Sequence, residues 1–99
     1  MKFMVQYSIS QDQFFPLLKR WVSMSAQEQM NAGEGVSIIG RWHDVAARGG
    51  VVILEAGDLL AVQRYIGQWT PYLDCDIAPV LDDAELTAVG RQIIADNNA

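Results

Sequence analysis

Four segments of this chain alternate apolar and polar side chains with a period of two, and their order restricts the possible folds most strongly. The segments span residues 2–9, 36–43, 51–56 and 72–81. Such alternation predicts β-strands with one buried face. Segments of helical apolar periodicity lie between the first and second strands, between the third and fourth, and after the fourth.

The order of these segments predicts the topology. The first helix is expected to begin near Gln13 or Phe15. The second follows Asp58 and a third follows Asp82–Asp83, where the acidic residues suit helix N-termini. Residues 45–50 end in Gly49–Gly50 and predict a hairpin between the second and third strands. The result is an α+β, ferredoxin-like βαββαβ fold with a four-stranded antiparallel sheet, helices on one face and an extra C-terminal helix.

Size and charge exclude several classes of protein. The chain has 99 residues without a repeat or linker, so residues 1–99 are predicted to form a single domain. Its formal charge of −5 argues against a nucleic-acid partner. The N-terminus has no signal-peptide pattern, and no segment approaches the ~18 apolar residues of a membrane span, so we expect a cytoplasmic protein without membrane contacts. Cys75, the only cysteine, is expected to be an unreactive core thiol.

The two faces of the predicted sheet differ in composition. The face expected to meet the helices is apolar in all four strands and includes Trp42 and Cys75. The opposite face, called the open face below, mixes apolar with polar and charged side chains: Met4, Gln6, Ser8, Ser37, Ile39, Arg41, His43, Val51, Ile53, Glu55, Tyr72, Asp74 and Asp76. Burying such charges requires pairing. The mixture predicts a homodimer in which a second copy packs over the open face and encloses a polar-lined cavity.

The strongest candidate chemistry lies in Arg41 and His43, which are two residues apart and therefore share a face of an unbroken strand. Glu55 lies on the same face if the residue numbers of each cross-strand pair in the hairpin add up to an even number, as with Ile39 opposite Glu55. A register shifted by one residue would instead place Glu55 on the core side. His43, the only histidine, is the candidate catalytic proton donor or acceptor. The guanidinium of Arg41 is suited to bind a carboxylate or an enolate. The expected ligand-binding set comprises Arg41, His43, Glu55, Tyr72, Asp76 and Gln6.

No cofactor or metal is expected. Asp74 and Asp76 share the predicted open face with His43, but one histidine and two carboxylates match no recognised metal-ligand spacing. Gly49–Gly50 lacks the Lys-Ser/Thr that completes a phosphate-binding loop.

Four stretches resemble a small bacterial family known as domain of unknown function 3303: MKFMVQYSIS, GVSIIGRWHD, GGVVILEAGD and DIAPVLDDAE. The resemblance covers nearly the whole chain and is most specific at residues 40–43, at Glu55 and at residues 79–80. It implies a dimeric α+β barrel, in which two ferredoxin-like sheets close around a cavity. Relatives of that broad architecture include small monooxygenases, isomerases and stress-related binding proteins. The family has no assigned reaction, so the resemblance implies no catalytic residue.

Three functions remain open at this point. The first is binding of a small organic or acidic ligand in the barrel cavity, which a cavity lined by Arg41, His43 and Tyr72 would favour. The second is a non-catalytic structural or interaction module, whose charges pair within a tightly packed dimer interface. The third is a cofactor-free enzyme resembling a monooxygenase or isomerase.

Overall fold

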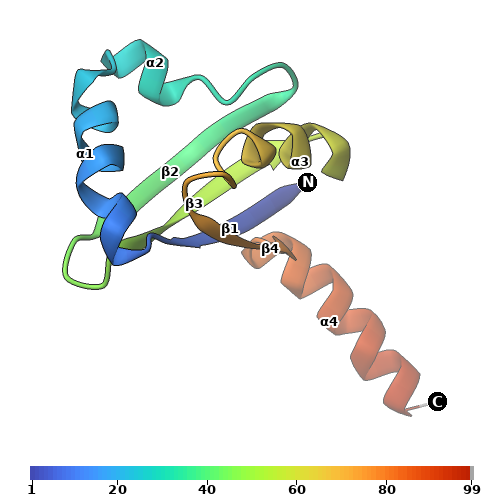
Figure 1. Cartoon of the computed structure of the whole chain (residues 1–99). Helices are drawn as coiled ribbons and strands as arrows, with labels where there is room; N and C mark the ends of the chain where they lie inside the picture. Colours follow the sequence, from blue (N-terminus) through green and yellow to red (C-terminus); the bar gives the residue numbers. More distant parts are fainter. Residues whose placement is uncertain (99) are drawn as a thin grey trace.

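A computed structural model describes residues 1–98 and shows an α+β fold with the predicted order of elements (Figure 1). The sheet has the strand order β2-β3-β1-β4, and each neighbouring pair is antiparallel. This is the ferredoxin-like arrangement, so the predicted fold class is confirmed. The elements are β1 (Lys2–Ser8), the 3-10 helix η1 (Gln11–Gln13), α1 (Phe14–Ser23), α2 (Ala26–Met30), β2 (Val36–Asp44), β3 (Gly49–Ala56), α3 (Leu59–Gly67), β4 (Asp74–Val80) and α4 (Asp83–Asn98).

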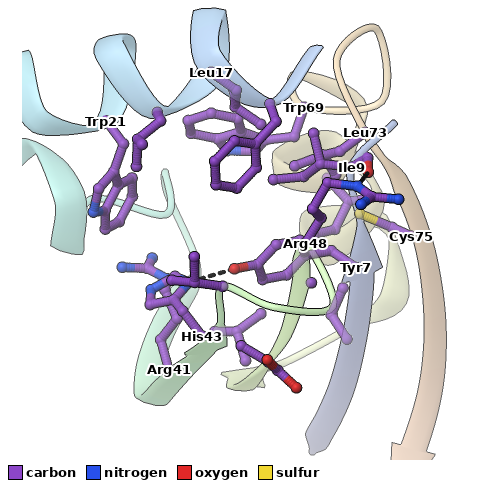
Figure 2. Close-up of a pocket in the computed structure, with 18 of the residues that line it drawn as sticks. Tyr7, Ile9, Leu17, Trp21, Arg41, His43, Arg48, Trp69, Leu73 and Cys75 are labelled. Carbon is purple, nitrogen blue, oxygen red and sulfur yellow. Dashed lines mark hydrogen bonds between the residues drawn. The ribbon is translucent and has the colours of Figure 1, made fainter. Parts of the chain in front are cut away.

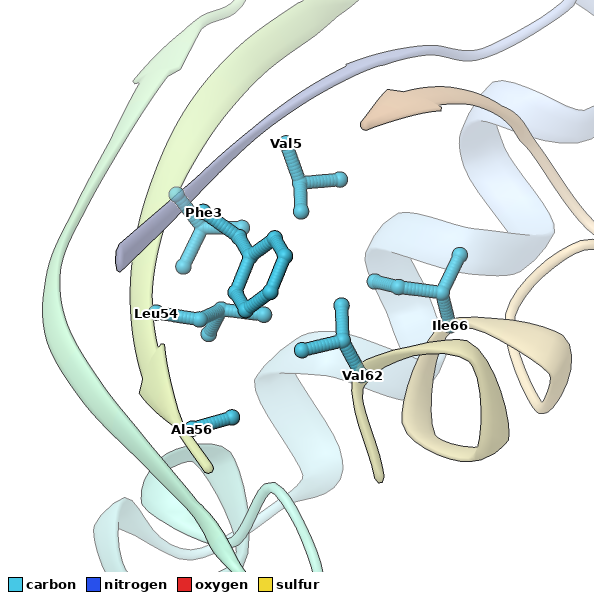
Figure 3. Packing of buried hydrophobic residues seen from close by; sticks show 7 residues of the cluster. Phe3, Val5, Leu54, Ala56, Val62 and Ile66 are labelled. Atoms are coloured by element: carbon cyan, nitrogen blue, oxygen red, sulfur yellow. The ribbon is translucent and has the colours of Figure 1, made fainter. Parts of the chain in front are cut away.

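The filled part of the core lies between α3 and the two central strands, β1 and β3 (Figure 3). Phe3, Leu54 and Val62 are at most 1% exposed. Alternate residues of both strands point toward α3, which presents Val62 and Ile66 one turn apart. The Asp58 side chain caps α3 by accepting a hydrogen bond from the Ala61 amide at 2.9 Å, as the sequence predicts.

Helices α1 and α2 are separated by a break at Met24. The Ser25 hydroxyl accepts from the Glu28 amide and the Glu28 carboxylate accepts from the Ser25 amide, which forms a capping box that starts α2. Pro16 lies in the first turn of α1. Backbone N–H groups in the first turn have no partner within the helix, so a proline there removes no helical hydrogen bond. Leu17 is the buried residue of α1, but it lies outside the core cluster around α3.

A β-bulge in β2 changes which side chains face the helices. Up to Ile38, which lies opposite Leu54, the strands pair with an even sum of residue numbers. From Gly40, which lies opposite Ile53, they pair with an odd sum, so Ile39 is one extra residue. Because side chains alternate along a strand, an extra residue reverses the orientation of everything that follows it.

The prediction that Arg41 and His43 lie on the open face is therefore wrong. Arg41 lies opposite the buried Val52, so it shares the side of the sheet that the helices cover. Trp42, predicted in the core, is 61% exposed on the open face. Its indole lies over Gly40, where any Cβ would collide with the ring, which explains the glycine at this position.

The hairpin between β2 and β3 also differs from the prediction. Its connection is residues 45–48, and Gly49 and Gly50 are the first residues of β3 rather than the turn. The Asp44 carboxylate accepts a hydrogen bond from the Ala47 amide and fixes the start of the turn. Arg48 takes the left-handed backbone conformation, with φ 53°.

Helix α4 extends away from the sheet and the other helices (Figure 1). A second capping box starts it: the Asp82 carboxylate accepts from the Glu85 amide, and the Glu85 carboxylate accepts from the Asp82 amide. Leu86 and Ile93 on this helix are more than half exposed. Within residues 1–98, no helix combines the length and apolar character needed to cross a membrane.

Candidate functional site

A cavity of about 300 Å³ lies between the sheet and α1, on the side that the helices cover (Figure 2). Most of its wall is apolar or aromatic, and its few polar side chains come mainly from β1, β2 and the hairpin. Small-molecule sites typically have this size and this composition. Side chains that define its wall include Phe14, Leu17, Trp21, Tyr65, Trp69 and Leu73.

Tyr7, Gly50 and His43 lie side by side on three neighbouring strands. A Cβ on Gly50 would be 2.6 Å from Tyr7 Cε1 and 2.7 Å from its hydroxyl oxygen, and would also collide with the Trp42 carbonyl. The phenol thus crosses β3 over the glycine, and its hydroxyl forms a hydrogen bond with His43 Nδ1 (Figure 2). The two rings meet edge to face, with centroids 5.8 Å apart. A side chain at position 50 would prevent this pairing.

Arg41 enters the same cavity from β2. Its Cζ lies 4.9 Å from the centre of the Trp21 ring, and the His43 ring centre lies 5.5 Å from that of Trp21. One terminal nitrogen of Arg41 donates to the Gln29 carbonyl at 2.9 Å and to the Tyr65 hydroxyl at 3.4 Å. Within residues 1–98, no carboxylate lies within 4.0 Å of the guanidinium. Arg41 is therefore a half-buried cation held by neutral groups.

The surroundings set the protonation of the Tyr7–His43 pair. Partial burial lowers the pKa of His43 below its usual value, and the charge of Arg41 lowers that pKa further. Burial raises the pKa of the Tyr7 hydroxyl, and Arg41 opposes this increase only in part. At neutral pH the imidazole is consequently uncharged and the phenol keeps its proton.

Cys75 lines the cavity from β4. Burial raises the pKa of its thiol to about 11, and the neighbouring carboxylates of Asp74 and Asp76 add to the increase. A thiol with such a pKa is almost entirely protonated near neutral pH and is a poor nucleophile. The structure thus agrees with the expectation of an unreactive cysteine.

Three of the predicted ligand-binding residues lie on the open face, away from the cavity. Gln6 and Asp76 pair across β1 and β4 and are exposed. The Glu55 carboxylate lies 3.2 Å from the Met1 amino group and 3.5 Å from Lys2 Nζ. The expected proximity of Glu55 and Arg41 is wrong, because the bulge places Arg41 on the other side of the sheet.

Tyr72 also lies outside the cavity wall. The chain is in a turn at this position, with the Tyr72 amide donating to the Trp69 carbonyl, and β4 begins only at Asp74. The Arg20 guanidinium carbon on α1 lies 5.0 Å from the Tyr72 ring centre and 5.3 Å from that of Trp69. The prediction that Tyr72 lies in the fourth strand and on the open face is therefore wrong: the residue precedes β4, and its ring packs against Arg20 of α1.

The sequence pattern did not single out Tyr7 or Trp21 as site residues: Tyr7 belongs to the apolar alternation of the first strand, and the helical spacing of Trp21 is that of a core or interface anchor. One signal pointed to Tyr7: a tyrosine among apolar neighbours needs a partner for its hydroxyl. Trp21 gave no such signal, because its spacing is that of an ordinary helix stripe. Within residues 1–98, no three His, Cys, Asp or Glu side chains gather closely enough to hold a metal ion.

Comparison with known proteins places all these residues within one family. A search of curated proteins returned no match. The family model described as Domain of unknown function (DUF3303) matches residues 1–94, which include every residue of the cavity. Because the match spans nearly the whole chain, this protein belongs to the DUF3303 family.

Proposed function

We propose that the cavity beneath α1 binds a small organic molecule with an apolar, ring-containing body and one acidic group. The observation that carries the proposal is the position of Arg41. It is a half-buried cation without a carboxylate partner in residues 1–98, and it lies in the wall of a mostly apolar cavity. A buried charge is stabilised by an opposite charge. An anionic ligand supplies that charge, and guanidinium binds carboxylates in a bidentate manner.

The size and walls of the cavity indicate the body of this ligand. Its volume of about 300 Å³ is twice the ~150 Å³ of an apolar cavity that holds one benzene ring. Trp21, Trp69 and Phe14 offer aromatic faces and edges on the helix side. A molecule of one or two rings fits these dimensions.

Binding of 1-naphthoate, followed by calorimetry and tryptophan fluorescence, tests the proposal. We expect saturable binding of one molecule per chain. Arg41→Met weakens it about tenfold or more, because the carboxylate loses its charged partner. Arg91→Met is the matched control: it removes the same charge from the exposed surface of α4 and leaves the affinity unchanged. The absence of saturable binding, or equal affinities of the two variants, would contradict the proposal.

A second candidate function is self-association through the open face of the sheet. The observation that favours it is the exposure of Trp42 and Ile39 on this face, at 61% and 55%. Large apolar side chains grouped on one face mark a contact surface. A second copy related by a two-fold axis presents the same surface, and the two sheets would then form a dimeric α+β barrel.

Sedimentation velocity at micromolar concentration tests this candidate. We expect a dimer that Trp42→Glu dissociates, because a charge in an apolar interface is costly. Leu60→Glu is the matched control, since Leu60 is 80% exposed on α3, away from the open face. A monomeric wild-type protein, or equal effects of the two variants, would rule the dimer out. The cavity lies within one chain, so this result leaves the ligand-binding proposal standing.

A further inference from the structure

The cavity holds the parts of a proton-transfer site. His43 lines it and remains exposed to solvent, so the imidazole can exchange protons with water. Its Nδ1 is bonded to the Tyr7 hydroxyl, and a guanidinium shares the same tryptophan neighbour. Resting on the ligand-binding function proposed above, we infer that His43 removes a proton from a carbon of the bound ligand, and that the ligand class is an enolisable aromatic carbonyl compound.

The base in this inference is the second nitrogen of His43. In the tautomer in which Nδ1–H donates to the Tyr7 oxygen, Nε2 carries a free lone pair. Within residues 1–98 no carboxylate forms an ion pair with His43, and the positive charge of Arg41 opposes protonation of the ring, so the neutral form is favoured. The cavity wall also contains Asp44 and Arg48. A neutral, oriented imidazole is the form that acts as a general base.

The positive charge of Arg41 stabilises the enolate that this proton removal forms. Removal of a proton beside a carbonyl places negative charge on the carbonyl oxygen, and this charge is larger in the transition state than in the ground state. A guanidinium fixed against Trp21 and bonded to Gln29 is already oriented before the reaction. In an enolisable ligand the carbonyl oxygen takes the place of the carboxylate beside Arg41, so the same cation lowers the barrier to enolate formation.

The proposed step balances without any other reactant. His43 Nε2 takes a proton from the carbon next to the carbonyl group. The electron pair of that C–H bond forms a carbon–carbon double bond, and the carbonyl π pair moves onto oxygen beside Arg41. The imidazolium then returns a proton to the same carbon or to another carbon of the enolate, which gives exchange or isomerisation.

The test is proton exchange of 2-tetralone, a two-ring aromatic ketone, in D₂O followed by proton NMR. We expect the protein to accelerate loss of the C1 proton signal above the buffer rate. His43→Asn reduces the protein-dependent rate about 100-fold or more, the usual contribution of a general base. Because the chain has one histidine, no other imidazole can replace it. Added imidazole restores part of the rate in this variant, and Arg91→Met retains the full rate.

Tyr7 is a positioning residue in this scheme, and Tyr7→Phe isolates that role because it keeps the ring. We expect a lower kcat for exchange with KM within about twofold, since the hydroxyl is bonded to His43 and acts through it. An unchanged kcat would overturn the role of Tyr7.

Parallel binding of 1-naphthoate separates the two proposals. If naphthoate binds but exchange proceeds at the buffer rate, or equally in wild type and His43→Asn, the proton-transfer inference is overturned and the binding function stands. If naphthoate does not bind, the proposed binding function fails at its own test, whatever the exchange rate.

Discussion

The helix-covered side of the sheet is filled at one end and hollow at the other. Under α3, Leu54 and Val62 are fully buried (Figure 3), whereas under α1, Tyr7 and His43 line a cavity of about 300 Å³ (Figure 2). Strand β1 runs through both regions and contributes Phe3 to the core and Tyr7 to the cavity. The same strands therefore contribute to the filled core at one end and to the candidate site at the other. Mutations can alter the stability of the fold and the properties of the site separately.

Truncation of one leucine in each region sharpens this comparison and has the largest expected effect. Leu54→Ala should reduce the free energy of unfolding by about 3 kcal/mol, because it opens a void in a filled core. Leu17→Ala should cost about 1 kcal/mol, because Leu17 already borders empty space and loses fewer contacts. Urea unfolding measures both. Equal losses would mean that the two regions are packed alike.

The reactivity of Cys75 tests whether the hollow region is shielded. Burial raises the pKa of its thiol from 9.0 to about 11, so the thiolate fraction near pH 8 should fall about 100-fold. Reaction with a maleimide at pH 8 should therefore be about 100-fold slower in the folded protein than in the urea-unfolded chain. A folded-state rate close to the unfolded one would show that solvent reaches this wall freely.

Titration of the single histidine has the smallest expected effect. Burial and then Arg41 lower the pKa of His43, so its imidazole NMR signal should titrate below the usual ~6.5. Arg41→Met should raise the midpoint of the His43 titration, because it removes the positive charge that contributes to the low pKa. The unfolded chain binds this proton more readily, so stability should fall as pH drops through ~6.5 toward the folded pKa, and this pH-dependent loss should be absent in His43→Asn. A midpoint at or above 6.5 would contradict the assigned environment.

The order of the helices and strands could be predicted from the sequence, and so could the face of the sheet on which several side chains lie. Alternation in the first strand, the cap at Asp58 and the apolar stripe of α3 all act locally, and each formed as expected. Gln6 and Glu55 lie on the predicted face because the pairing of β1 with β3 is regular. In these segments the local pattern and the tertiary structure agree.

The candidate site was only partly predictable. Arg41 and His43 were identified, but Ile38–Ile39–Gly40 fits either orientation of β2, since two adjacent isoleucines offer an apolar side chain to both faces. The contact of Tyr7 with His43 depends on Gly50, which lies between them only once three strands are aligned. Such placement depends on long-range pairing that no local pattern records.

The extra residue at Ile39 also determines how other members of the family should be compared with this one. Two chains can share the letters Gly-Arg-Trp-His and still present them to opposite sides, if one lacks a single residue between the start of β2 and the arginine. A one-residue gap in an alignment is then more informative than any substitution nearby. Counting the residues from Val36 to Arg41 separates relatives that keep this cavity wall from those whose arginine and histidine point away from it.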